Sequence, residues 1–309
     1  MSSFVGIDVS KATLAVAVRP AGSSLSFTND AQGHRDLLQS LKGLSVSRIV
    51  LEATGGYERA LLVALLDAGL PAVRVSPHRA RAFATAMGRL AKSDPIDAAV
   101  LAHLAEVLDV GSTPVVSPKQ QALRDLVQRR EQLIQWRDDE RRRVQQAASP
   151  FVRHSLQRSL VATQREITRC DREITAALAA VDLESSQRLL AVPGIGPVTT
   201  ASLLAYVPEL GTLDRRQVAA LVGLAPYNSD SGAHTGKRRI HGGRPRIRRV
   251  LYMAAWSAIR SQPDFKARYQ DLRQRGKCAK VALVACMRVL LIRINAMLRD
   301  KTEWKMAKI

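Results

Sequence analysis

Short stretches of alternating apolar and polar residues open the chain and predict β-strands. In residues 4–11, Val5, Ile7 and Val9 lie on one face at period two, while Gly6 and Asp8 lie on the other. Similar stretches rich in β-branched and other apolar residues predict strands at 13–18, 25–28, 48–52 and 72–75. Apolar residues at helical spacing predict helices at 29–41, 57–66 and 93–108.

The order of these elements is three strands followed by helices that alternate with strands, as in an RNase H-like domain. Turn-forming residues at 20–23 make the first links short, which predicts an antiparallel meander. We therefore expect an α/β domain over residues 1–112, with a mixed five-stranded sheet and helices. Such a fold does not by itself define a function.

The pattern changes after this domain. Gln, Arg and Glu interleaved with spaced apolar residues at 118–180, with a break at 148–150, predict two long helices. We interpret them as a helical coiled-coil arm over residues 113–184. Apolar helices on both sides of a Gly-containing turn, followed by two closing helices at 247–259 and 280–298, predict a mostly helical C-terminal domain over 185–309.

Charge is distributed unevenly along the chain. Residues 1–110 carry 11 Lys and Arg against 10 Asp and Glu, whereas residues 111–309 carry 36 against 17, within a net charge of +20. This excess indicates a polyanionic partner, and nucleic acid fits better than a membrane because no basic helix has an aromatic-rich face. A merely solvated basic surface is the alternative. We expect no membrane span, since we identify no stretch of about 18 apolar residues.

Three widely spaced cysteines, Cys170, Cys278 and Cys286, match neither a disulfide framework nor a zinc motif. We interpret them as small core residues of a protein of the reducing bacterial cytoplasm. The sequence also lacks G-x-x-x-x-G-K-[ST] and G-x-G-x-x-G motifs, so nucleotide hydrolysis and dinucleotide chemistry have no support.

Two acidic residues occupy unusual places in the predicted strands. Asp8 lies within an apolar strand, where burial of a lone carboxylate is costly unless a cation is near, and Gly6 leaves space beside it. Glu52 ends a strand just before a Gly-rich loop, where ligands of open α/β sheets commonly bind. The alternative is that each acid is an ordinary solvent-exposed strand-end residue.

Two further acids begin the helix at 93–108. Asp94 could serve as its N-cap before Pro95, and Asp97 would favour the positive end of the helix dipole, so a purely structural role is one explanation. However, Asp97 also begins the apolar row of this helix, and Asp94 lies on nearly the same side. Both can therefore point toward Asp8 and Glu52. Four such acids could hold two divalent ions about 4 Å apart, as in phosphodiester transfer.

The C-terminal domain contains two candidate phosphate-binding segments. The turn Gly194-Ile195-Gly196 resembles a helix-hairpin-helix device, whose backbone N–H groups hold phosphate, although an ordinary tight turn is the alternative. A hydroxyl of the run at 229–232 could act as a nucleophile among cations, or the run could be a simple loop. Residues 231–250 hold no acid and seven basic residues: Lys237, Arg238, Arg239, Arg244, Arg246, Arg248 and Arg249.

Five motifs follow one another along nearly the whole chain. They are Gly6-Ile7-Asp8-Val9-Ser10-Lys11, Leu51-Glu52-Ala53-Thr54-Gly55, Lys92-Ser93-Asp94-Pro95-Ile96-Asp97-Ala98, Val192-Pro193-Gly194-Ile195-Gly196, and Gly223-Leu224-Ala225-Pro226 with Ser231-Gly232. In this order the set closely resembles the IS-one-ten family of insertion-sequence transposases.

The resemblance implies a role for each motif. An RNase H/RuvC-like domain would supply a magnesium-binding tetrad formed by Asp8, Glu52, Asp94 and Asp97, holding two ions, for which manganese could substitute. The C-terminal domain would supply a nucleophilic serine five residues after the motif proline. That residue is Ser231, whereas Ser229 lacks the spacing. The family also implies a structured non-coding RNA that pairs with donor and target DNA, and a homodimer that assembles into a homotetramer.

The resulting hypothesis is a DNA transposase or recombinase in which Ser231 becomes covalently linked to DNA at a metal-assisted site. A RuvC-like junction resolvase that uses water, and a non-catalytic architectural nucleic-acid binder, are the alternatives. For the arm we predict outer faces that follow nucleic acid through Arg137, Arg141, Arg142 and Arg143, or else a solvated linker. We also predict that two chains pair along Leu126, Leu133, Ile167 and Ile174.

Overall fold

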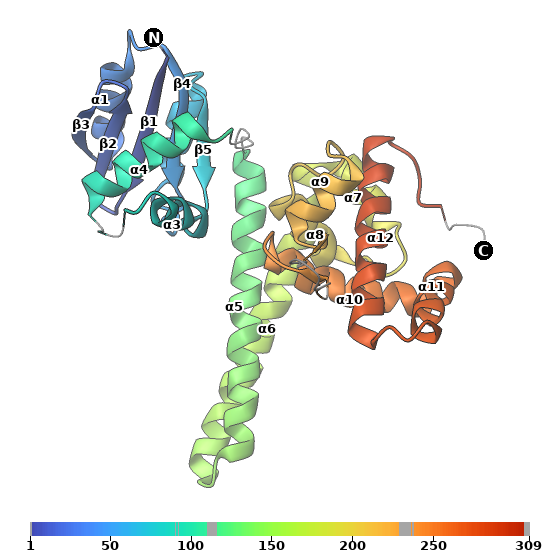
Figure 1. The fold of residues 1–309 in the computed structure, drawn as a ribbon. Helices are drawn as coiled ribbons and strands as arrows, with labels where there is room; N and C mark the ends of the chain where they lie inside the picture. Colours follow the sequence, from blue (N-terminus) through green and yellow to red (C-terminus); the bar gives the residue numbers. More distant parts are fainter. Residues whose placement is uncertain are drawn as a thin grey trace. The chain divides into compact units, whose positions relative to one another are not determined.

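The computed structural model describes residues 2–89, 91, 93–109, 116–228, 236 and 238–305. Its contacts divide the chain into two compact units, residues 1–115 and 116–309 (Figure 1). Each unit has a hydrophobic core of its own. The finer division at 112 and 184 stays a prediction.

The N-terminal unit contains a mixed five-stranded sheet in the order β3-β2-β1-β4-β5. Its strands are β1 (Ser3–Val9), β2 (Thr13–Arg19), β3 (Ser23–Thr28), β4 (Val46–Glu52) and β5 (Ala72–Val75). The first three strands pair antiparallel because short turns connect them. β4 pairs parallel with both β1 and β5. This is the RNase H-like sheet that the sequence predicts.

Helices cover both faces of this sheet. They are α1 (Ala31–Leu41), α2 (Arg59–Asp67), α3 (Pro77–Ala86) and α4 (Asp94–Val107). On one face, Ile7 and Leu51 pack with Leu37 of α1 and Leu61 of α2. On the other face, Val50 packs with residues of α3 and α4. Figure 1 shows α4 crossing this second face.

The sequence prediction omits α3. The buried residues of this helix are Ala80 and Ala84, whose small side chains give a weak periodic signal. Its start is nevertheless marked locally, because Ser76 Oγ accepts a hydrogen bond from the backbone N–H of Arg79 (3.3 Å) and Pro77 occupies the first turn.

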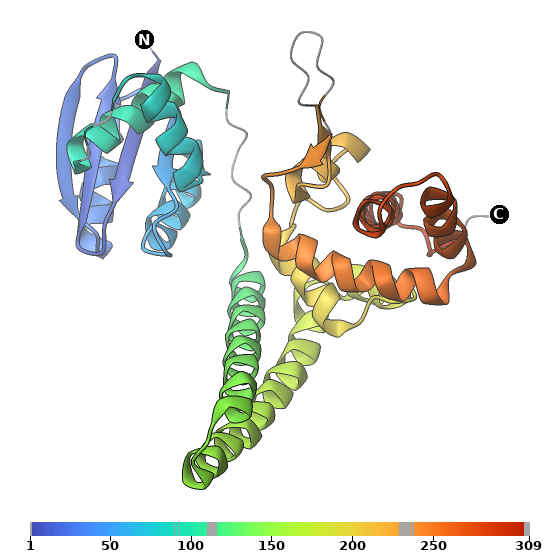
Figure 2. The same ribbon diagram turned by 60° about the horizontal axis from the view of Figure 1, so that its bottom comes forward.

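The C-terminal unit is mostly helical. It contains α5 (Pro118–Gln146), α6 (Pro150–Val181), α7 (Leu183–Leu190), α8 (Pro197–Tyr206), α9 (Arg215–Val222), α10 (Pro245–Ser261), α11 (Pro263–Gln274) and α12 (Ala279–Arg299). A short antiparallel pair joins β6 (Pro226–Tyr227) to β7 (Arg239–Ile240). Figures 1 and 2 both show α5 and α6 side by side as a long hairpin. The base of the hairpin belongs to the core of the unit, through residues such as Ile174 and Leu178.

The two closing helices predicted at 247–259 and 280–298 are confirmed as α10 and α12, but the prediction misses α11 between them. Only Phe265 of α11 is buried, so this helix lacks a readable apolar stripe. The short α9 and the β6–β7 pair are likewise beyond what the sequence pattern predicts.

The expectation that no stretch is long and apolar enough to span a membrane is also wrong. Helix α12 is long and apolar enough to pass that test, and half of the stretch is buried inside the unit. Leu283, Leu290 and Ile294 are fully or almost fully buried in the core. The helix is apolar on several sides because α7, α9, α10 and α11 all pack against it.

The arm differs from the prediction in its apolar residues. Leu133, Ile167 and Ile174 are buried within the single chain, and Leu126 packs against the same core. Because α5 and α6 of one chain cover Leu133, Ile167 and Ile174, the prediction that two chains pair along these three residues is wrong. Pairing at the half-buried Leu126, and the dimer itself, stay predictions.

Several of the predicted outer arginines of the arm have acidic neighbours on their own helix. Arg137 contacts Asp138 at 2.9 Å, Arg142 contacts Asp139, and Arg143 contacts Glu140 at 2.8 Å. These contacts reduce the positive charge that this part of the arm can offer to nucleic acid.

The cysteines are not all core residues. Cys286 is buried, Cys170 is half-buried and Cys278 is exposed, and none of the three forms a disulfide. The interpretation of Cys278 as a core residue is wrong, because it precedes α12 at the surface as its N-cap residue.

Candidate active site

Asp8 and Glu52 occupy equivalent positions on two neighbouring parallel strands. The register of β1 and β4 pairs Gly6 with Val50 and Ile7 with Leu51, and the two acids come next. Since side chains alternate between faces, Asp8 lies on the face of Gly6 and Glu52 on the face of Val50. That is the face covered by α4. Both carboxyl-bearing residues are half-buried.

Helix α4 packs directly onto β1 at Gly6. A Cβ atom at this position would lie 2.1 Å from the backbone N of Ala102 and 2.2 Å from the carbonyl O of Ala98. Only glycine therefore allows the helix to approach this closely. Asp97 precedes Ala98 by one residue, so the close contact brings the start of α4 near the end of β1 that carries Asp8.

The other end of α4 is fixed by Arg48 of β4. Its Nη1 donates hydrogen bonds to the carbonyl oxygens of Ala105 (3.0 Å) and Leu108 (2.7 Å). These are among the last carbonyls of the helix, which lack partners within it and attract a positive charge. Arg19 of β2 adds an ion pair with Glu106 at 2.6 Å. The orientation of α4 on the sheet is thus held at both ends.

Asp94 and Asp97 both lie in the first turn of α4. The prediction that Asp94 caps this helix is wrong by one residue: Ser93 is the N-cap residue, and its side chain makes no capping hydrogen bond. Asp94 is exposed, and Asp97 is half-buried. The four predicted tetrad residues thus come from the carboxyl ends of β1 and β4 and from the helix that covers their shared face.

The donors fit a hard divalent cation in chemical type, since carboxylate oxygens are the ligands that magnesium prefers. Among the residues that the structure describes, no group of three or more His, Cys, Asp or Glu is already arranged to hold a metal ion. Asp8, Glu52 and Asp97 each interact with other groups of the chain. Ion binding would therefore have to exchange these interactions and draw the carboxylates closer together.

A buried acid next to this set is missing from the sequence analysis. Glu58 is only 2% exposed and accepts hydrogen bonds from the backbone N–H groups of Thr54 (3.2 Å) and Gly56 (2.9 Å) and from Arg74 Nη1 (3.1 Å). Burial alone would raise the pKa of Glu58, but its backbone hydrogen bonds and Arg74 outweigh that effect and lower the pKa. Glu58 thereby fixes the loop that follows Glu52. The sequence did offer a signal for this role, because Glu58 is an acid at the start of an otherwise apolar helix.

The Gly-Leu-Ala-Pro motif of the C-terminal unit is built around a tight backbone contact. Gly223 ends α9 with a φ of 79°, and a Cβ there would lie 2.4 Å from the carbonyl O of Gly242. Arg248 secures the contact by donating to the carbonyl oxygens of Val222 (3.0 Å) and Gly242. The motif and the basic segment that follows β7 are therefore packed against each other. Ser231 and Lys237 lie outside the described residues.

The predicted nucleic-acid contacts divide into two groups. Arg244 makes two short ion-pair contacts with Glu209 (2.6 and 2.7 Å), and Arg246 pairs with Glu131 at 2.8 Å. Together with Arg248, these arginines have structural partners. In contrast, Arg238, Arg239 and Arg249 are exposed, and no described carboxylate lies within ion-pair distance of them.

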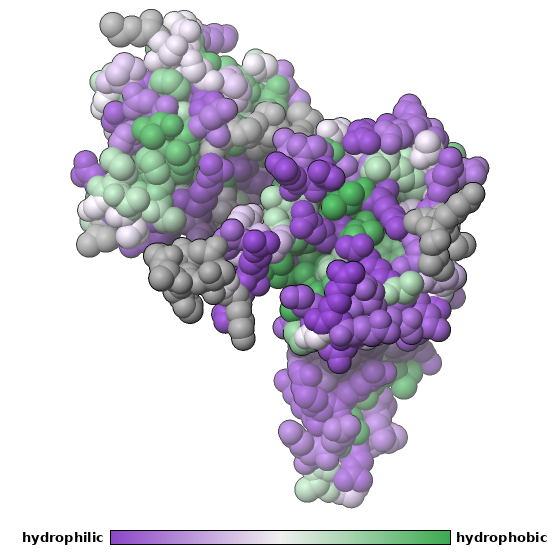
Figure 3. Space-filling model, turned by 45° about the vertical axis from the view of Figure 1, so that its right-hand side comes forward, coloured by the Kyte–Doolittle hydropathy of each residue, from purple (hydrophilic) through white to green (hydrophobic). Residues whose placement is uncertain are grey.

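Arg238 and Arg239 line a large basic hollow between α9, β6–β7 and α12. It has a volume of about 910 Å³ and an apolar floor of α12 residues such as Val284 and Ile292. Among the described residues, its lining includes no acid and seven basic residues: Arg215, Arg216, Arg238, Arg239, Arg268, Lys280 and Arg288. The Nε atom of Arg288 is buried and has no hydrogen-bond partner among the described residues. Figure 3 shows apolar side chains on this unit bordered by hydrophilic ones.

The predicted helix-hairpin-helix turn has a clear structural function. Gly194 has a φ of 96°, and a Cβ there would lie 2.9 Å from the Cβ of Ser257 in α10. The buried Gln262 donates to the carbonyl O of Pro193 at 2.9 Å. Gly196, the N-cap of α8, has open space around it. Its role in phosphate binding stays a prediction.

Comparisons with known proteins agree with this architecture. A protein-family model described as "Transposase" matches residues 5–149, and one described as "Transposase IS116/IS110/IS902 family" matches residues 186–270. The chain is 27% identical over 313 aligned positions to the "Pilin gene-inverting protein" of Moraxella lacunata and of Moraxella bovis, covering 96% of each chain. It is 32% identical over 154 positions to the "Insertion element IS110 uncharacterized 43.6 kDa protein" of Streptomyces coelicolor, covering 49% of this chain and 37% of that protein.

The RNase H-like sheet, the helical C-terminal unit and these matches define a DNA transposase or recombinase. The chain belongs to the IS110 (IS-one-ten) family of insertion-sequence transposases and is related to the pilin gene-inverting proteins. Membership of this family implies DNA binding and the cleavage and transfer of DNA strands. It also implies a divalent metal, as is typical of transposases with such an acidic set.

Proposed function

We propose that this transposase exchanges DNA strands through a covalent serine intermediate, using Asp8, Glu52, Asp94 and Asp97 as metal-binding residues and Ser231 as nucleophile. One observation carries the metal-binding part. Asp8 and Glu52 end adjacent parallel strands on one face, and the helix packed on that face begins with Asp94 and Asp97. For Ser231, support comes from its place five residues after Pro226 and from the basic hollow that Pro226 helps to line.

The acids have defined tasks in this proposal. Asp8 and Glu52 would hold the metal from the sheet, and Asp94 and Asp97 would hold it from the helix. A bound divalent ion supplies positive charge that stabilises the phosphate oxygens during transfer. Glu58 is a positioning residue, because it holds the loop after Glu52 without belonging to the donor set.

The serine step conserves phosphodiester bonds. The Oγ atom of Ser231 forms a bond to phosphorus, the bond from phosphorus to one deoxyribose oxygen breaks, and the serine proton passes to solvent as the leaving oxygen gains one. The hydroxyl of another DNA strand then attacks the phosphoserine and releases Ser231. Because the phosphoester bond is kept throughout, rejoining requires no high-energy cofactor.

The basic hollow suits the negatively charged backbone of the substrate. The described lining residues include seven cationic side chains and no acid, which would attract a polyanion. Arg288 also contributes a buried N–H that has no partner in the described part of the chain. We therefore assign Arg238 and Arg239 to phosphate binding.

The choice of DNA sequence would be delegated to a structured non-coding RNA that pairs with donor and target. The chain has few aromatic residues, 4% in all, and a strongly basic second half, which favour recognition of backbone and shape over reading of bases. Protein freed of RNA should bind DNA weakly and with steep salt dependence. Undiminished site-specific activity after complete RNase digestion would contradict the RNA-guided part.

The covalent intermediate is tested by trapping it. Purified protein is incubated with nicked and intact donor DNA and Mg²⁺, denatured, digested with protease and analysed by mass spectrometry for a nucleotide on serine. Wild-type protein should give an adduct at Ser231. Ser231→Ala should abolish the adduct, while Ser229→Ala, the matched control, should retain it.

The alternatives give different results in the same assay. A junction resolvase that uses water would cleave branched DNA with Mg²⁺, and Ser231→Ala would cleave as well as the wild type. An architectural binder would retain DNA binding without any cleavage. An adduct on another residue would remove Ser231 from the site while leaving the acids unaffected.

Assembly belongs to the same proposal. The family resemblance favours a dimer that pairs into a tetramer, with Ser231 of one subunit acting beside the acids of its partner. Mixing Asp8→Asn protein with Ser231→Ala protein, each inactive alone, should restore the adduct in mixed dimers. If mixed dimers form without an adduct, the site is built within one chain.

A further inference from the structure

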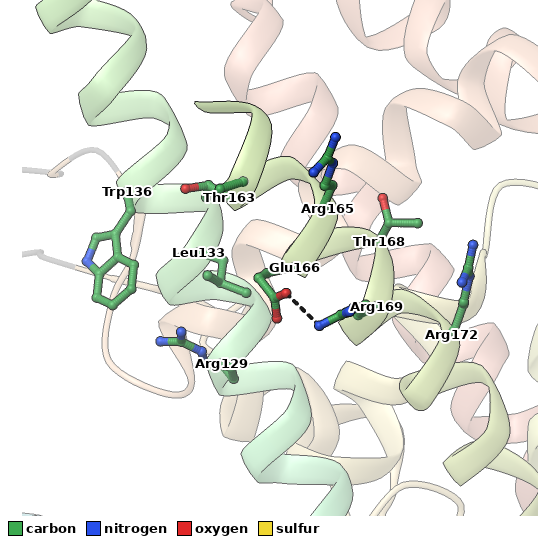
Figure 4. Close-up of a pocket in the computed structure, with 10 residues that line it drawn as sticks. Arg129, Leu133, Trp136, Thr163, Arg165, Glu166, Thr168, Arg169 and Arg172 are labelled. Atoms are coloured by element: carbon green, nitrogen blue, oxygen red, sulfur yellow. Dashed lines mark hydrogen bonds and ion pairs between the residues drawn. The ribbon is translucent and has the colours of Figure 1, made fainter. Parts of the chain in front are cut away.

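The arm carries an open groove between α5 and α6 that differs from the rest of its surface. The groove has a volume of about 650 Å³, and Figure 4 shows its lining. Arg129, Leu133 and Trp136 come from α5 at helical spacing, so that they lie on one face. The lining residues on α6 are Ala162, Thr163, Arg165, Glu166, Thr168, Arg169 and Arg172.

Trp136 is exposed in this groove although tryptophan is costly to leave in water. Its exposed fraction is 51%, and the Arg129 guanidinium lies 4.9 Å from the centre of its ring. This cation–π contact holds the indole without burying it. An exposed, oriented aromatic ring offers a flat surface on which a base can stack.

The α6 side of the groove is lined by cations (Figure 4). The lining has four arginines and one acid, and Glu166 pairs only with Arg169 (3.0 Å) among them. Arg165 and Arg172 are exposed and have no ion-pair partner in the described part of the chain. Both lie on α6, on the other side of Leu133 from Trp136 (Figure 4). Phosphate groups of a strand crossing the groove could therefore meet arginine while one of its bases meets indole.

We propose that this groove binds a single-stranded segment of nucleic acid, with one unpaired base stacked on Trp136 and its phosphates held by Arg165 and Arg172. The arginines of the groove favour a polyanion. The exposed indole of Trp136 favours an unpaired strand over a duplex, because the bases of a duplex are already stacked on one another. The inference extends the nucleic-acid part of the proposed function and does not depend on the chemistry of Ser231.

The test measures binding of labelled single strands of about 12 nucleotides, a length within the usual range for single-strand sites. Oligouridylate and oligothymidylate are compared with a duplex of equal length, in EDTA so that no strand transfer occurs. Trp136→Ala should weaken single-strand binding by roughly 5- to 150-fold, with a much smaller effect on the duplex. If the variant loses more affinity for oligouridylate, the natural occupant is RNA, and if it loses more affinity for oligothymidylate, it is DNA. Either result supports the site.

Matched variants separate stacking from general effects. Trp136→Phe should keep most of the affinity but lose the quenching of tryptophan fluorescence that accompanies binding. Phe151→Ala, which removes another exposed aromatic residue of α6, should bind as the wild type does. Arg165→Gln with Arg172→Gln should reduce the salt dependence by about 0.7 in log–log slope for each lost phosphate contact. Arg158→Gln, which removes an exposed arginine of α6 that does not line the groove, should not.

Two results would overturn the inference. The first is unchanged single-strand affinity in folded Trp136→Ala and in the Arg165→Gln, Arg172→Gln double variant, with folding checked by thermal melting. The second is a change of oligomeric mass in these variants, by light scattering, without a change in nucleic-acid affinity. That result would assign the groove to a second copy of the chain.

Discussion

Arg74 donates a hydrogen bond to Glu58 Oε1 at 3.1 Å, at the place where the loop after β4 turns into α2. Glu58 also accepts the N–H groups of Thr54 and Gly56, so a single carboxylate organises the loop next to Glu52. Glu58→Gln keeps the size of the side chain but removes its charge. We expect a loss of about 2 kcal/mol in the free energy of unfolding of the N-terminal unit, typical of hydrogen bonds to a charged group. Thermal or urea unfolding measures it.

The same residue gives a pH dependence with a definite sign. The pKa of Glu58 is lower in the folded chain than its ordinary value of 4.5. Its stabilising contribution is therefore complete above about pH 4.5 and is lost as the pH falls through the lower folded pKa. Wild-type protein should lose more stability than Glu58→Gln when the pH is lowered through this range. Equal losses would contradict the assignment of the acid-sensitive contribution to Glu58.

Gly6→Ala should displace α4 from the sheet. The new Cβ would come within 2.2 Å of backbone atoms of Ala98 and Ala102, which cannot yield as a flexible side chain would. The cost should reach or exceed the upper end of the roughly 1–3 kcal/mol range for overpacking. Gly196→Ala is the control, because nothing lies within 4 Å of its Cβ position. Denaturant unfolding of both variants, and metal affinity of any folded Gly6→Ala protein, check the prediction.

Metal binding should be visible in stability as well as in activity. If Asp8, Glu52, Asp94 and Asp97 hold a divalent ion, Mg²⁺ or Mn²⁺ should raise the melting temperature of the wild type by mass action. Asp8→Asn and Asp97→Asn should remain folded and lose this increase, together with strand cleavage. Asp36→Asn, at an exposed position of α1, is the control and should retain both. An undiminished increase in Asp8→Asn would remove Asp8 from the metal site.

The arginines of the C-terminal unit should separate into two phenotypes. Arg244→Gln breaks the half-buried contacts with Glu209 and should destabilise the unit by about 1–3 kcal/mol. Arg238→Gln and Arg239→Gln should leave stability unchanged and weaken DNA binding, with the log–log salt slope lower by about 0.9 for each phosphate contact. Melting curves and DNA titrations at several salt concentrations distinguish the two groups.

Cysteine chemistry provides an independent probe of the helical core. Burial raises the pKa of Cys286 to about 11, whereas Cys278 is exposed at the start of α12. At about pH 8 only roughly one in a thousand Cys286 thiols would be thiolate, the reactive form. Iodoacetamide should therefore label Cys278 in native protein and Cys286 only after unfolding, as peptide mass spectrometry can show. Rapid labelling of native Cys286 would mean that α12 leaves the core readily.

The sequence predicts most of the N-terminal unit because its signals are local. Strand alternation around Ile7 and the apolar helix after Asp97 each depend on a few consecutive residues, and the observed β1 and α4 confirm them. The burial of Glu58 depends on its partner Arg74, which lies on β5. The spacing of residues in α2 cannot reveal a partner from another element. The same limit applies to the C-terminal arginines. A run of cations looks uniform in sequence, but Glu209 and Glu131 select Arg244 and Arg246 through tertiary contacts.

Motif resemblance and geometry contribute differently to the site. The first-turn position of Asp94 and Asp97 is readable from Pro95, although the cap falls on Ser93. The sequence pattern does not predict how closely α4 approaches β1. This approach brings backbone atoms of Ala98 and Ala102 next to Gly6, and only the folded packing places them there. The pairing assigned to Leu133 and Ile167 failed for a related reason. Apolar spacing shows that a helix needs a partner, but not whether that partner is in the same chain.

The central place of α12 sets an order of events during synthesis. Helices α7, α9, α10 and α11 all pack on α12, and residues as late as Ile294 complete their core. The N-terminal unit, by contrast, closes its sheet and helices with residues made before 109. A ribosome therefore releases a finished sheet domain long before the helical unit can bury its apolar surfaces. During that interval those surfaces are open to chaperones, and a stop codon placed before α12 would leave a folded sheet domain attached to basic helices whose apolar faces are uncovered.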